Sequence, residues 1–210
     1  MKRISALMTA CLLLFSLTAC GSNSKTEATS EPVSESPKYS EEETSAPAET
    51  GTKGLVVYFS WSGNTEMVAQ EIANQTGADI FEIIPQTPYS DDYDTVVDLA
   101  QQEQSDNARP AISGSIENLA DYDVIYVGYP NWWGDMPMIL YAFFDSYDLA
   151  GKTVAPFCTS GGSGLSNTVS EIQSLEPDAT VTEGLHIGES SADAPAAVVA
   201  DWLQAIEQEG

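Results

Sequence analysis

The amino-acid sequence predicts a doubly wound α/β domain, in which a five-stranded parallel sheet carries helices on both faces. Short apolar runs alternate with segments of helical period from residue 54 to the carboxyl terminus. The runs are apolar throughout rather than at every second position, which is typical of strands covered on both faces. Five such runs alternate with five helical segments, and this alternation indicates parallel strands joined by helical crossovers.

The first strand is predicted at LVVYFS, residues 55–60, a continuous apolar run with β-branched residues. The helix that follows spans about residues 65–76, where two aliphatic side chains four positions apart share one face. ADIFEII, residues 78–84, is the next strand. Pro85 closes that strand, because proline has no N–H group for the hydrogen-bond ladder.

The middle of the chain repeats this alternation. DVIYVGY, residues 123–129, predicts the third strand, and MILYAFFDSY, residues 138–147, is apolar on all sides and predicts a buried helix. The helix before that strand is marked by apolar residues at i, i+3, i+4 and i+7, which are Tyr93, Val96, Val97 and Ala100.

The last third supplies two more strands, KTVAPFCT at residues 152–159 and TVTEGLHI at residues 180–187. The helix between them is marked by apolar residues at helical spacing, Leu165, Val169 and Ile172. The final amphipathic helix carries Val199, Trp202, Leu203 and Ile206 on one face.

Three loops after predicted strands have a specialised composition. In doubly wound sheets ligands bind beyond the carboxyl ends of the strands, where the strand order reverses. This rule selects the loops after the first, third and fourth strands, SWSGNT (60–65), PNWWGD (130–135) and TSGGSG (159–164). We therefore expect the functional site where these three loops meet.

The loop SWSGNT has the chemistry of a phosphate site. Ser60, Ser62 and Thr65 offer hydroxyl groups, Gly63 permits a tight turn, and the helix that begins here presents unpaired N–H groups. Simple capping of the helix by serine or asparagine is the alternative interpretation. A nucleoside-triphosphate loop is disfavoured, because the lysine that such a loop requires is absent.

The other two loops favour a flat heterocycle. The glycines of TSGGSG let a ligand approach the backbone closely, although the loop also suits a flexible connection. Trp132 and Trp133 lie between Pro130 and Gly134, which marks a loop rather than a strand or helix interior. Packing into the core is the alternative for the two tryptophans, but neighbours in a tight loop seldom both point inward.

Three segments, YFSWSGNT, GYPNWWGDMP and PFCTSGGSGLSN, resemble the three flavin-mononucleotide (FMN) loops of the flavodoxin family. The resemblance covers residues 53–210 and is greatest to the flavodoxin-like branch of anaerobic bacteria, which includes secreted lipoproteins. It implies a strand order of 2-1-3-4-5 and FMN as the cofactor. It also implies that the protein transfers electrons one or two at a time, with the chemistry supplied by the flavin.

The resemblance assigns the phosphate to the first loop, through Ser60, Trp61, Ser62, Gly63, Asn64 and Thr65. It places beside the isoalloxazine the residues Pro130, Asn131, Trp132, Trp133 and Gly134. It places against the pyrimidine edge the residues Thr159, Ser160, Gly161, Gly162, Ser163 and Gly164. Within the second loop it implies that Trp133 stacks on the flavin, that Trp132 shields or packs the loop, and that the Gly134 carbonyl turns toward flavin N5 on reduction.

The amino terminus predicts export and a lipid anchor. Lys2 and Arg3 precede an apolar run that is too short for a typical membrane span. The run ends at Leu17-Thr18-Ala19-Cys20, which resembles a bacterial lipobox and implies a lipidated Cys20, with an ordinary secretory signal as the alternative. Residues 1–20 are then the signal peptide, and residues 21–52 a disordered acidic stalk rich in Ser, Thr, Pro and Glu. We expect an extracytoplasmic protein that contacts the membrane only through its anchor.

The charge of the predicted domain limits its partners. Residues 53–210 hold three basic residues against 25 acids, a formal charge of −22 within a chain of −25. Nucleic acid and anionic lipid are excluded as partners because they carry the same sign. A redox protein or a small electron donor or acceptor remains as the partner, and we expect a monomer. So many acids disfavour an anionic reduced flavin, which predicts a low reduction potential.

Alternatives to an electron carrier remain open. One is an FMN-dependent NAD(P)H oxidoreductase that reduces quinones, and Arg109 is the residue that could serve a cofactor phosphate. The other is a non-redox binding lipoprotein. No partner for His186 is evident in the sequence, so it is expected to be a strand-end polar residue rather than a catalyst, and Cys158 an inert thiol in the core. Three acids before a helix favour its N-terminal dipole over a metal site: Asp91, Asp92 and Asp94.

Overall fold

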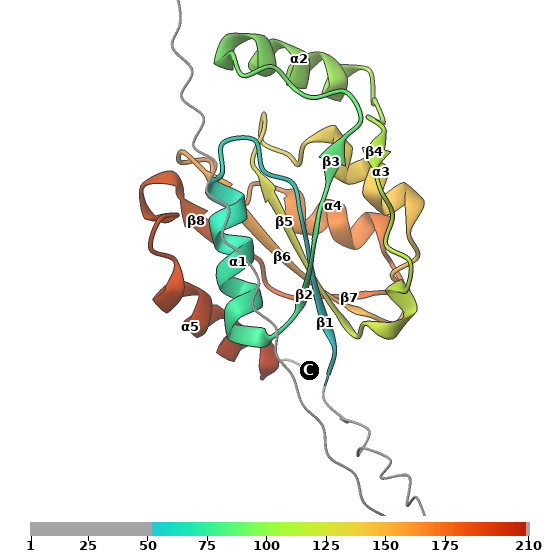
Figure 1. Ribbon diagram of the computed structural model, residues 1–210, viewed down its shortest axis with the longest axis vertical. Coiled ribbons are helices and arrows are strands. Elements are labelled where there is room, and N and C mark those ends of the chain that lie inside the picture. The colour runs from blue at the N-terminus through green and yellow to red at the C-terminus, as the bar shows by residue number, and fades with distance from the viewer. Residues whose placement is uncertain (1–51, 209–210) are drawn as a thin grey trace, which may run out of the picture. The chain divides into compact units, whose positions relative to one another are not determined.

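The computed structural model describes residues 52–208 (Figure 1). The predicted signal peptide, the lipidated Cys20 and all but the last residue of the predicted stalk lie outside the described residues. In the described part of the chain, no helix is both long and apolar enough to cross a membrane.

One parallel sheet forms the centre of the domain, in the order β2-β1-β5-β6 with β7 and β8 both beside β6. If β7 and β8 are counted as one interrupted strand, this is the predicted order 2-1-3-4-5. The predicted fold class is therefore confirmed. The strands are β1 (Gly54–Tyr58), β2 (Asp79–Glu82), β5 (Val124–Pro130), β6 (Thr153–Ser160), β7 (Thr180–Val181) and β8 (Leu185–Gly188).

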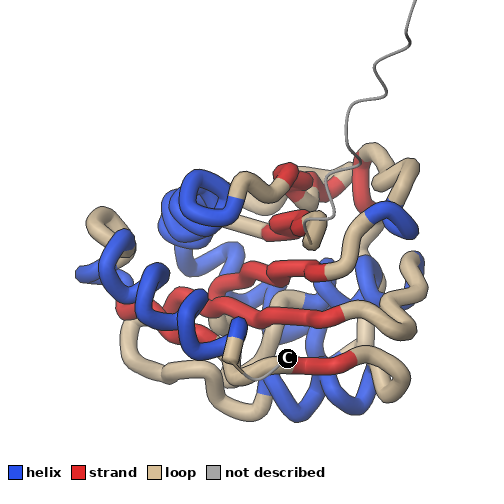
Figure 2. The backbone as a smooth tube through the Cα atoms, turned by 90° about the horizontal axis from the view of Figure 1, so that it is seen from below, coloured by secondary structure: helices blue, strands red, loops and turns tan. Residues whose placement is uncertain are grey.

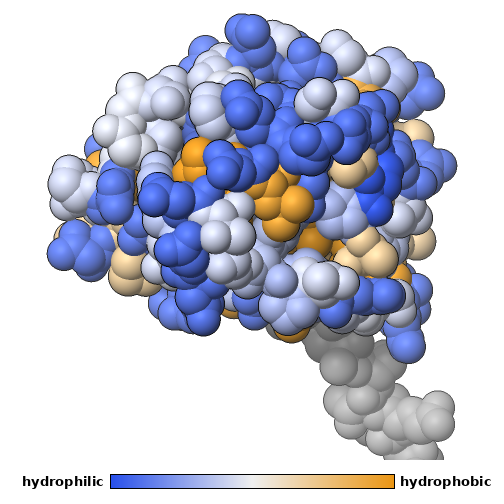
Figure 3. Space-filling model, turned by 90° about the horizontal axis from the view of Figure 1, so that it is seen from above, coloured by the Kyte–Doolittle hydropathy of each residue, from blue (hydrophilic) through white to orange (hydrophobic). Residues whose placement is uncertain are grey.

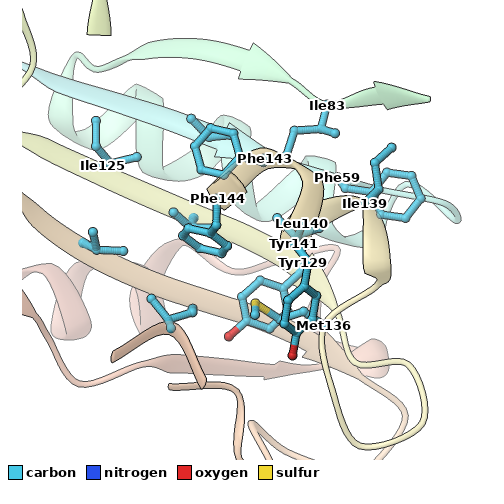
Figure 4. Close-up of a cluster of buried hydrophobic side chains, with 14 of the residues drawn as sticks. Phe59, Ile83, Ile125, Tyr129, Met136, Ile139, Leu140, Tyr141, Phe143 and Phe144 are labelled. Atoms are coloured by element: carbon cyan, nitrogen blue, oxygen red, sulfur yellow. The ribbon is translucent and has the colours of Figure 1, made fainter. Parts of the chain in front are cut away.

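Helices cover both faces of the sheet (Figure 2). On one face, α1 (Asn64–Thr76) and α5 (Ala196–Glu207) bury aliphatic side chains against β1 and β6. On the other, α3 (Met138–Ser146) and α4 (Thr168–Leu175) pack against β1, β5 and β6. The all-apolar sequence of α3 is explained by this packing, because it is buried from Met138 to Phe144 (Figure 4).

The fifth strand is interrupted, which the sequence does not reveal. Three residues, 182–184, separate β7 from β8, whereas only Ala155 and Pro156 separate their register partners on β6. Pro156 has no N–H group to donate, so the ladder is weakened at this point. Gly184 fits the interruption because a Cβ there would lie 2.9 Å from the side chain of Val169.

The predicted strand at residues 78–84 is shorter than expected, and the chain then leaves the sheet. After β2, Ile83 is buried and its N–H group donates to the Tyr58 carbonyl, whereas Ile84 is 50% exposed. Ile84 and Pro85 form β3, which pairs antiparallel with β4 (Ile112–Ser113) in a separate two-stranded sheet.

Between β3 and β4 the chain forms α2 (Tyr93–Ser105), which lies across the carboxyl-end edge of the sheet (Figure 1). The expectation that this helix covers a face is therefore wrong. Of its predicted apolar stripe, Val96 and Ala100 are buried, but Tyr93 is 66% exposed, because the helix packs on the edge through a narrow contact. Viewed from above, this side of the molecule is mostly polar with a small group of apolar side chains exposed among them (Figure 3).

Candidate functional site

The three specialised loops meet at the carboxyl ends of β1, β5 and β6, as predicted. The hydroxyl groups of Thr65 and Thr159 lie 2.8 Å apart and join the first loop to the third. The N–H group of Asn131 donates to the Thr159 carbonyl at 2.9 Å and joins the second loop to the third. Hydrogen bonds within the chain therefore assemble the site, and all three predicted loops take part.

The first loop presents free backbone donors at the start of α1. The Gly63 N–H group donates to Ser60 Oγ at 3.2 Å, and Gly63 adopts a φ of 87°, a left-handed conformation that favours glycine. The carbonyl of Gly63 accepts the N–H group of Met67, but no side chain caps the helix. The N–H groups of the first turn are thus left for a ligand, and their orientation together with the helix dipole favours an anion such as a phosphate. The alternative of simple side-chain capping is not what the structure shows.

Trp61 lies in the first loop, but its side chain turns toward the segment before α2. Its indole N–H group donates to the Ser90 carbonyl at 2.9 Å, and its ring centroid lies 6.1 Å from that of Tyr93. The side chain of Trp61 therefore holds a neighbouring segment in place, rather than pointing to the predicted phosphate position.

The second loop is a tight turn in which the two tryptophans point in different directions. Trp132 and Asp135 pair through two backbone hydrogen bonds of 2.8 and 3.1 Å. The turn between them requires left-handed backbone at Trp133, with a φ of 55°, and at Gly134, with a φ of 80°. A left-handed conformation is costly for a bulky residue such as tryptophan and is typically found at functional positions.

Trp132 packs inward. Its ring meets Phe59 and Tyr89 edge to face, with centroids 5.5 and 5.3 Å apart. Trp133 is 52% exposed, and its indole N–H group donates to the Val97 carbonyl on α2 at 3.0 Å. Trp133 is therefore the tryptophan whose ring is available to a ligand, while the ring of Trp132 packs on Phe59 and Tyr89.

Asn131 joins the second and third loops through its side chain. Its Oδ1 atom accepts the N–H group of Gly134 at 3.0 Å. Its Nδ2 atom donates to the Gly164 carbonyl at 3.0 Å and to Ser166 Oγ at 2.9 Å. All three bonds end on backbone or hydroxyl groups beside the glycine turns, so this single amide fixes the spacing of the two loops.

The third loop is organised around a buried hydroxyl group. Ser160 Oγ accepts the N–H groups of Gly162 and Gly164 at 3.3 and 3.0 Å, and it lies 2.8 Å from His186 Nε2. The sequence shows no partner for His186, and the structure supplies one in Ser160. Gly162 and Gly164 adopt φ values of 151° and 65°, which explains their identity as glycine.

The residues outside these loops that sequence reasoning missed are Tyr89, His186 and the Val97 carbonyl. Tyr89 packs on Trp132 and donates its hydroxyl group to Glu103 at 2.9 Å, and burial raises the pKa of both side chains. The only signal in the sequence was the apolar stripe that placed Val97 on a helix. The contacts of these residues with the loops, across 26 to 43 residues of sequence, gave no signal.

Two other predicted features lie apart from this chemistry. Cys158 is buried in β6, as predicted, and burial raises the pKa of its thiol to about 12, so the thiol is unreactive at neutral pH. Asp92 caps α2 by accepting the N–H and hydroxyl groups of Thr95 at 2.9 and 2.6 Å, and these bonds lower its pKa. Asp92 therefore acts as the helix cap, and Asp94 lies in the first turn of α2.

A profile of the family described as "Flavodoxin" matches residues 53–206. The chain belongs to the flavodoxin family. The crystal structure of a protein described as a flavoprotein from Bacteroides eggerthii is 34% identical, with a TM-score of 0.68 over 75% of this chain and 99% of that one. A flavoprotein from Lactobacillus acidophilus, crystallised in complex with FMN, is 25% identical, with a TM-score of 0.58 over 68% of this chain and 97% of its own.

A curated relative of this flavodoxin domain is an enzyme. The "NAD(P)H dehydrogenase (quinone)" of Caulobacter vibrioides is 33% identical over 98 residues, which are 45% of this chain. The match spans 46% of the relative, less than half of its length.

Proposed function

We propose that this flavodoxin domain is an electron carrier that holds FMN at its three loops and is anchored outside the cytoplasm. FMN is the cofactor of the family to which the chain belongs. The observation that carries the proposal is the uncapped amino terminus of α1, which presents N–H groups beside the hydroxyls of Ser60, Ser62 and Thr65. That donor set fits a phosphate monoester without a basic residue.

Each of the three loops would bind a different part of FMN. The first loop would hold the phosphate through backbone N–H groups and hydroxyls. Trp133 would cover one face of the flavin ring, and Gly134, with its left-handed backbone, supplies a peptide next to that ring. The third loop would bind the polar edge of the ring through its backbone. Bound FMN supplies transfer of one or two electrons, while the protein orients the ring and excludes water from it.

The proposal is tested by adding FMN to the purified apoprotein. We expect the fluorescence of FMN to be quenched with a 1:1 end point, and the absorption spectrum of the complex to be that of a protein-bound flavin. Ser62→Ala combined with Thr65→Val removes two of the hydroxyls and should weaken binding, whereas Ser174→Ala on α4 should not. A protein that neither binds FMN nor carries it after purification from its native membrane contradicts the proposal.

A second candidate function is an FMN-dependent NAD(P)H oxidoreductase, which the match to the Caulobacter relative favours. The distribution of charge argues against it. Lys53 and Lys152 lie at the amino-terminal ends of β1 and β6, the opposite edge from the site. Arg109 is paired with Asp145 and also donates to the Asn107 carbonyl. Within residues 52–208, no other lysine or arginine could bind the 2′-phosphate of NADPH.

A steady-state assay separates the two candidates. The FMN-loaded protein is mixed with NADH or NADPH and a quinone, and oxidation of the nucleotide is followed. An electron carrier should show little turnover with either nucleotide but should be reduced by dithionite and reoxidised by a protein or small-molecule acceptor. Rapid turnover that saturates with NADH or NADPH would favour the oxidoreductase.

The anchor is proposed from the lipobox-like sequence that ends at Cys20. Metabolic labelling with a radioactive fatty acid should mark the wild-type chain and not Cys20→Ser. The variant should also move from the membrane fraction to the soluble extracytoplasmic fraction. A soluble wild-type chain without label would support an ordinary secretory signal instead.

A further inference from the structure

We propose that His186 is a positioning residue for the flavin and makes FMN binding sensitive to pH through Ser160. His186 lies on β8 and Ser160 at the end of β6, and the two side chains meet behind the third loop. The inference rests on the proposed function, because the loop concerned is the one that would hold the polar edge of the flavin.

The hydrogen bonds that Ser160 accepts determine where its hydroxyl hydrogen points. A serine hydroxyl has one hydrogen and two lone pairs. The N–H groups of Gly162 and Gly164 occupy the lone pairs, because an amide nitrogen can only donate. The hydroxyl hydrogen is then left for His186 Nε2, which must accept it at 2.8 Å. His186 is therefore neutral in this arrangement, with its proton on Nδ1.

Protonation of His186 breaks this arrangement. A charged imidazole carries a hydrogen on Nε2 and can no longer accept the Ser160 hydroxyl hydrogen. Ser160 would have to turn a lone pair toward Nε2 and release the N–H group of Gly162 or Gly164. The backbone of the third loop would then lose one of its two hydrogen bonds to Ser160. Imidazole is the side chain that commonly gains a proton on mild acidification, so acidification is the perturbation that tests this link.

The other groups around His186 do not reproduce this effect. On β6 its register partner is Cys158, whose thiol stays neutral at these pH values because burial raises its pKa to about 12. On the α4 side the side chains that face this strand at Gly184 are Leu165 and Val169, which carry no charge. Glu189, in the short 3₁₀ turn after β8, has a carboxylate oxygen 3.7 Å from the Cβ position of Gly161. Glu183 flanks β8 on the other side and is exposed.

The net charge of the domain alone should make FMN binding tighter, not weaker, as pH falls. As pH falls, carboxylates become neutral, repulsion of the FMN phosphate decreases, and binding should tighten. The FMN phosphate itself takes up a proton at about pH 6, which weakens its attraction to the N–H groups of α1 in wild type and variants alike, so the contribution of His186 is the difference between wild type and His186→Gln. Loss of one neutral hydrogen bond corresponds to about a five- to tenfold rise in Kd.

The tautomer of His186 can be measured directly, because it is the one histidine in the chain. In ¹⁵N-labelled protein made without a histidine tag, a long-range ¹H–¹⁵N spectrum at pH 7.5 should show Nδ1 protonated and Nε2 unprotonated. The opposite tautomer, or a charged ring at this pH, overturns the proposal. This measurement needs no variant and no flavin.

The affinity measurement compares wild type with two variants between pH 7.5 and pH 5.5. The Kd of wild type for FMN should rise about five- to tenfold on acidification. His186→Gln, whose amide oxygen accepts from Ser160 without titrating, should lack this rise and show only the smaller change that the titrating FMN phosphate causes in every variant. Ser160→Ala should bind weakly at both, and Ser174→Ala, which removes an exposed hydroxyl on α4, should behave as wild type.

The outcomes separate this inference from the assignment of the flavin. Equal pH dependence in wild type and His186→Gln overturns the role of His186 and leaves FMN binding intact. Failure of wild type to bind FMN at pH 7.5 overturns the flavin site instead, and the tautomer then still decides whether Ser160 donates to His186. Thermal unfolding at both pH values must show that each variant is folded.

Discussion

At the scale of single residues, the backbone of the second loop gives its two tryptophans different environments. Trp132 is held in the bridge to Asp135, which directs its ring onto Phe59 and Tyr89. Trp133 has left-handed backbone, which directs its ring away from the core. Neighbouring residues of the same type therefore have different consequences when they are replaced.

Trp133→Ala should weaken FMN binding by about 1–3 kcal/mol, the scale of a lost aromatic contact. Trp132→Ala should reduce FMN affinity less but should lower the free energy of unfolding by about 2–4 kcal/mol, because it leaves a cavity under the loop. The two readouts are a fluorescence titration with FMN and urea unfolding of the apoprotein. Equal losses of affinity, or the reverse order, would contradict the assignment of the stacking ring to Trp133.

Asn131 tests the link between the second and third loops. Asn131→Asp keeps the acceptor for the Gly134 N–H group but removes the donor to Gly164 and Ser166. We expect FMN affinity to fall by about 1–3 kcal/mol, because the partly buried Gly164 carbonyl loses this donor and the two loops lose their link. Ser166→Ala removes one acceptor of the same amide and serves as the milder control. An unchanged affinity in Asn131→Asp would show that the loops keep their spacing without this side chain.

At the scale of elements, α2 is the part of the molecule that departs most from the predicted arrangement. It is tied to the site by two indole N–H groups, from Trp61 to the Ser90 carbonyl and from Trp133 to the Val97 carbonyl. The helix therefore lies beside the predicted flavin position and is connected to two of its three loops.

Trp61→Phe should loosen α2 without unfolding the domain. Phenylalanine keeps the aromatic contact with Tyr93 but cannot donate to Ser90. We expect faster hydrogen–deuterium exchange for amides in residues 90–105, with little change elsewhere. Trp202→Phe is the matched control, because it removes the indole bond to the Glu183 carbonyl on another part of the domain. Exchange that rises equally in both regions in Trp61→Phe would contradict a local role.

Glu103 on α2 should make stability depend on pH. Burial raises its pKa, and the hydrogen bond from Tyr89 offsets part of that rise. Since the folded chain holds this proton more tightly than the unfolded chain, stability falls as pH rises from the ordinary carboxyl range through the raised pKa. Glu103→Gln keeps the acceptor for Tyr89 and should be more stable than wild type at pH 7.

The advantage of Glu103→Gln should shrink as pH falls and vanish at about pH 3, below the ordinary glutamate pKa, where the wild-type carboxyl is protonated in both states. Urea unfolding at the two pH values measures it. Glu71→Gln on α1 removes one partly exposed negative charge and controls for general repulsion. An equal gain in both variants at pH 7 would assign the effect to net charge rather than to burial.

At the scale of the whole molecule, the sequence was sufficient for the sheet but not for the edge that carries the site. Continuous apolar runs predicted the strands, because a strand covered on both faces has no polar side. The path of α2 was not predictable, since an amphipathic stripe shows that a helix packs but not on what. The contact of His186 with Ser160 was also missed, because it joins two strands 26 residues apart and no local pattern marks it.

The acidity of the domain should lower the reduction potential of its flavin. Electrons added to FMN enter a field of −22 formal charges, which disfavours the reduced state. Raising the ionic strength from about 0.01 M to 1 M screens this field and should raise the potential. Anaerobic redox titrations at the two salt concentrations, with free FMN as the reference, measure the effect. A potential above that of free FMN at low salt would contradict this account.

The hydrogen bond between Thr65 and Thr159 has a consequence for how the protein matures. Together with the amide of Asn131, it joins all three loops through hydrogen bonds of the protein's own groups. These bonds involve no flavin atom, so we expect folding and loading with FMN to be separable events. For a chain that crosses a membrane before it folds, as its amino terminus predicts, the flavin can be taken up last, from whatever supply exists on the far side.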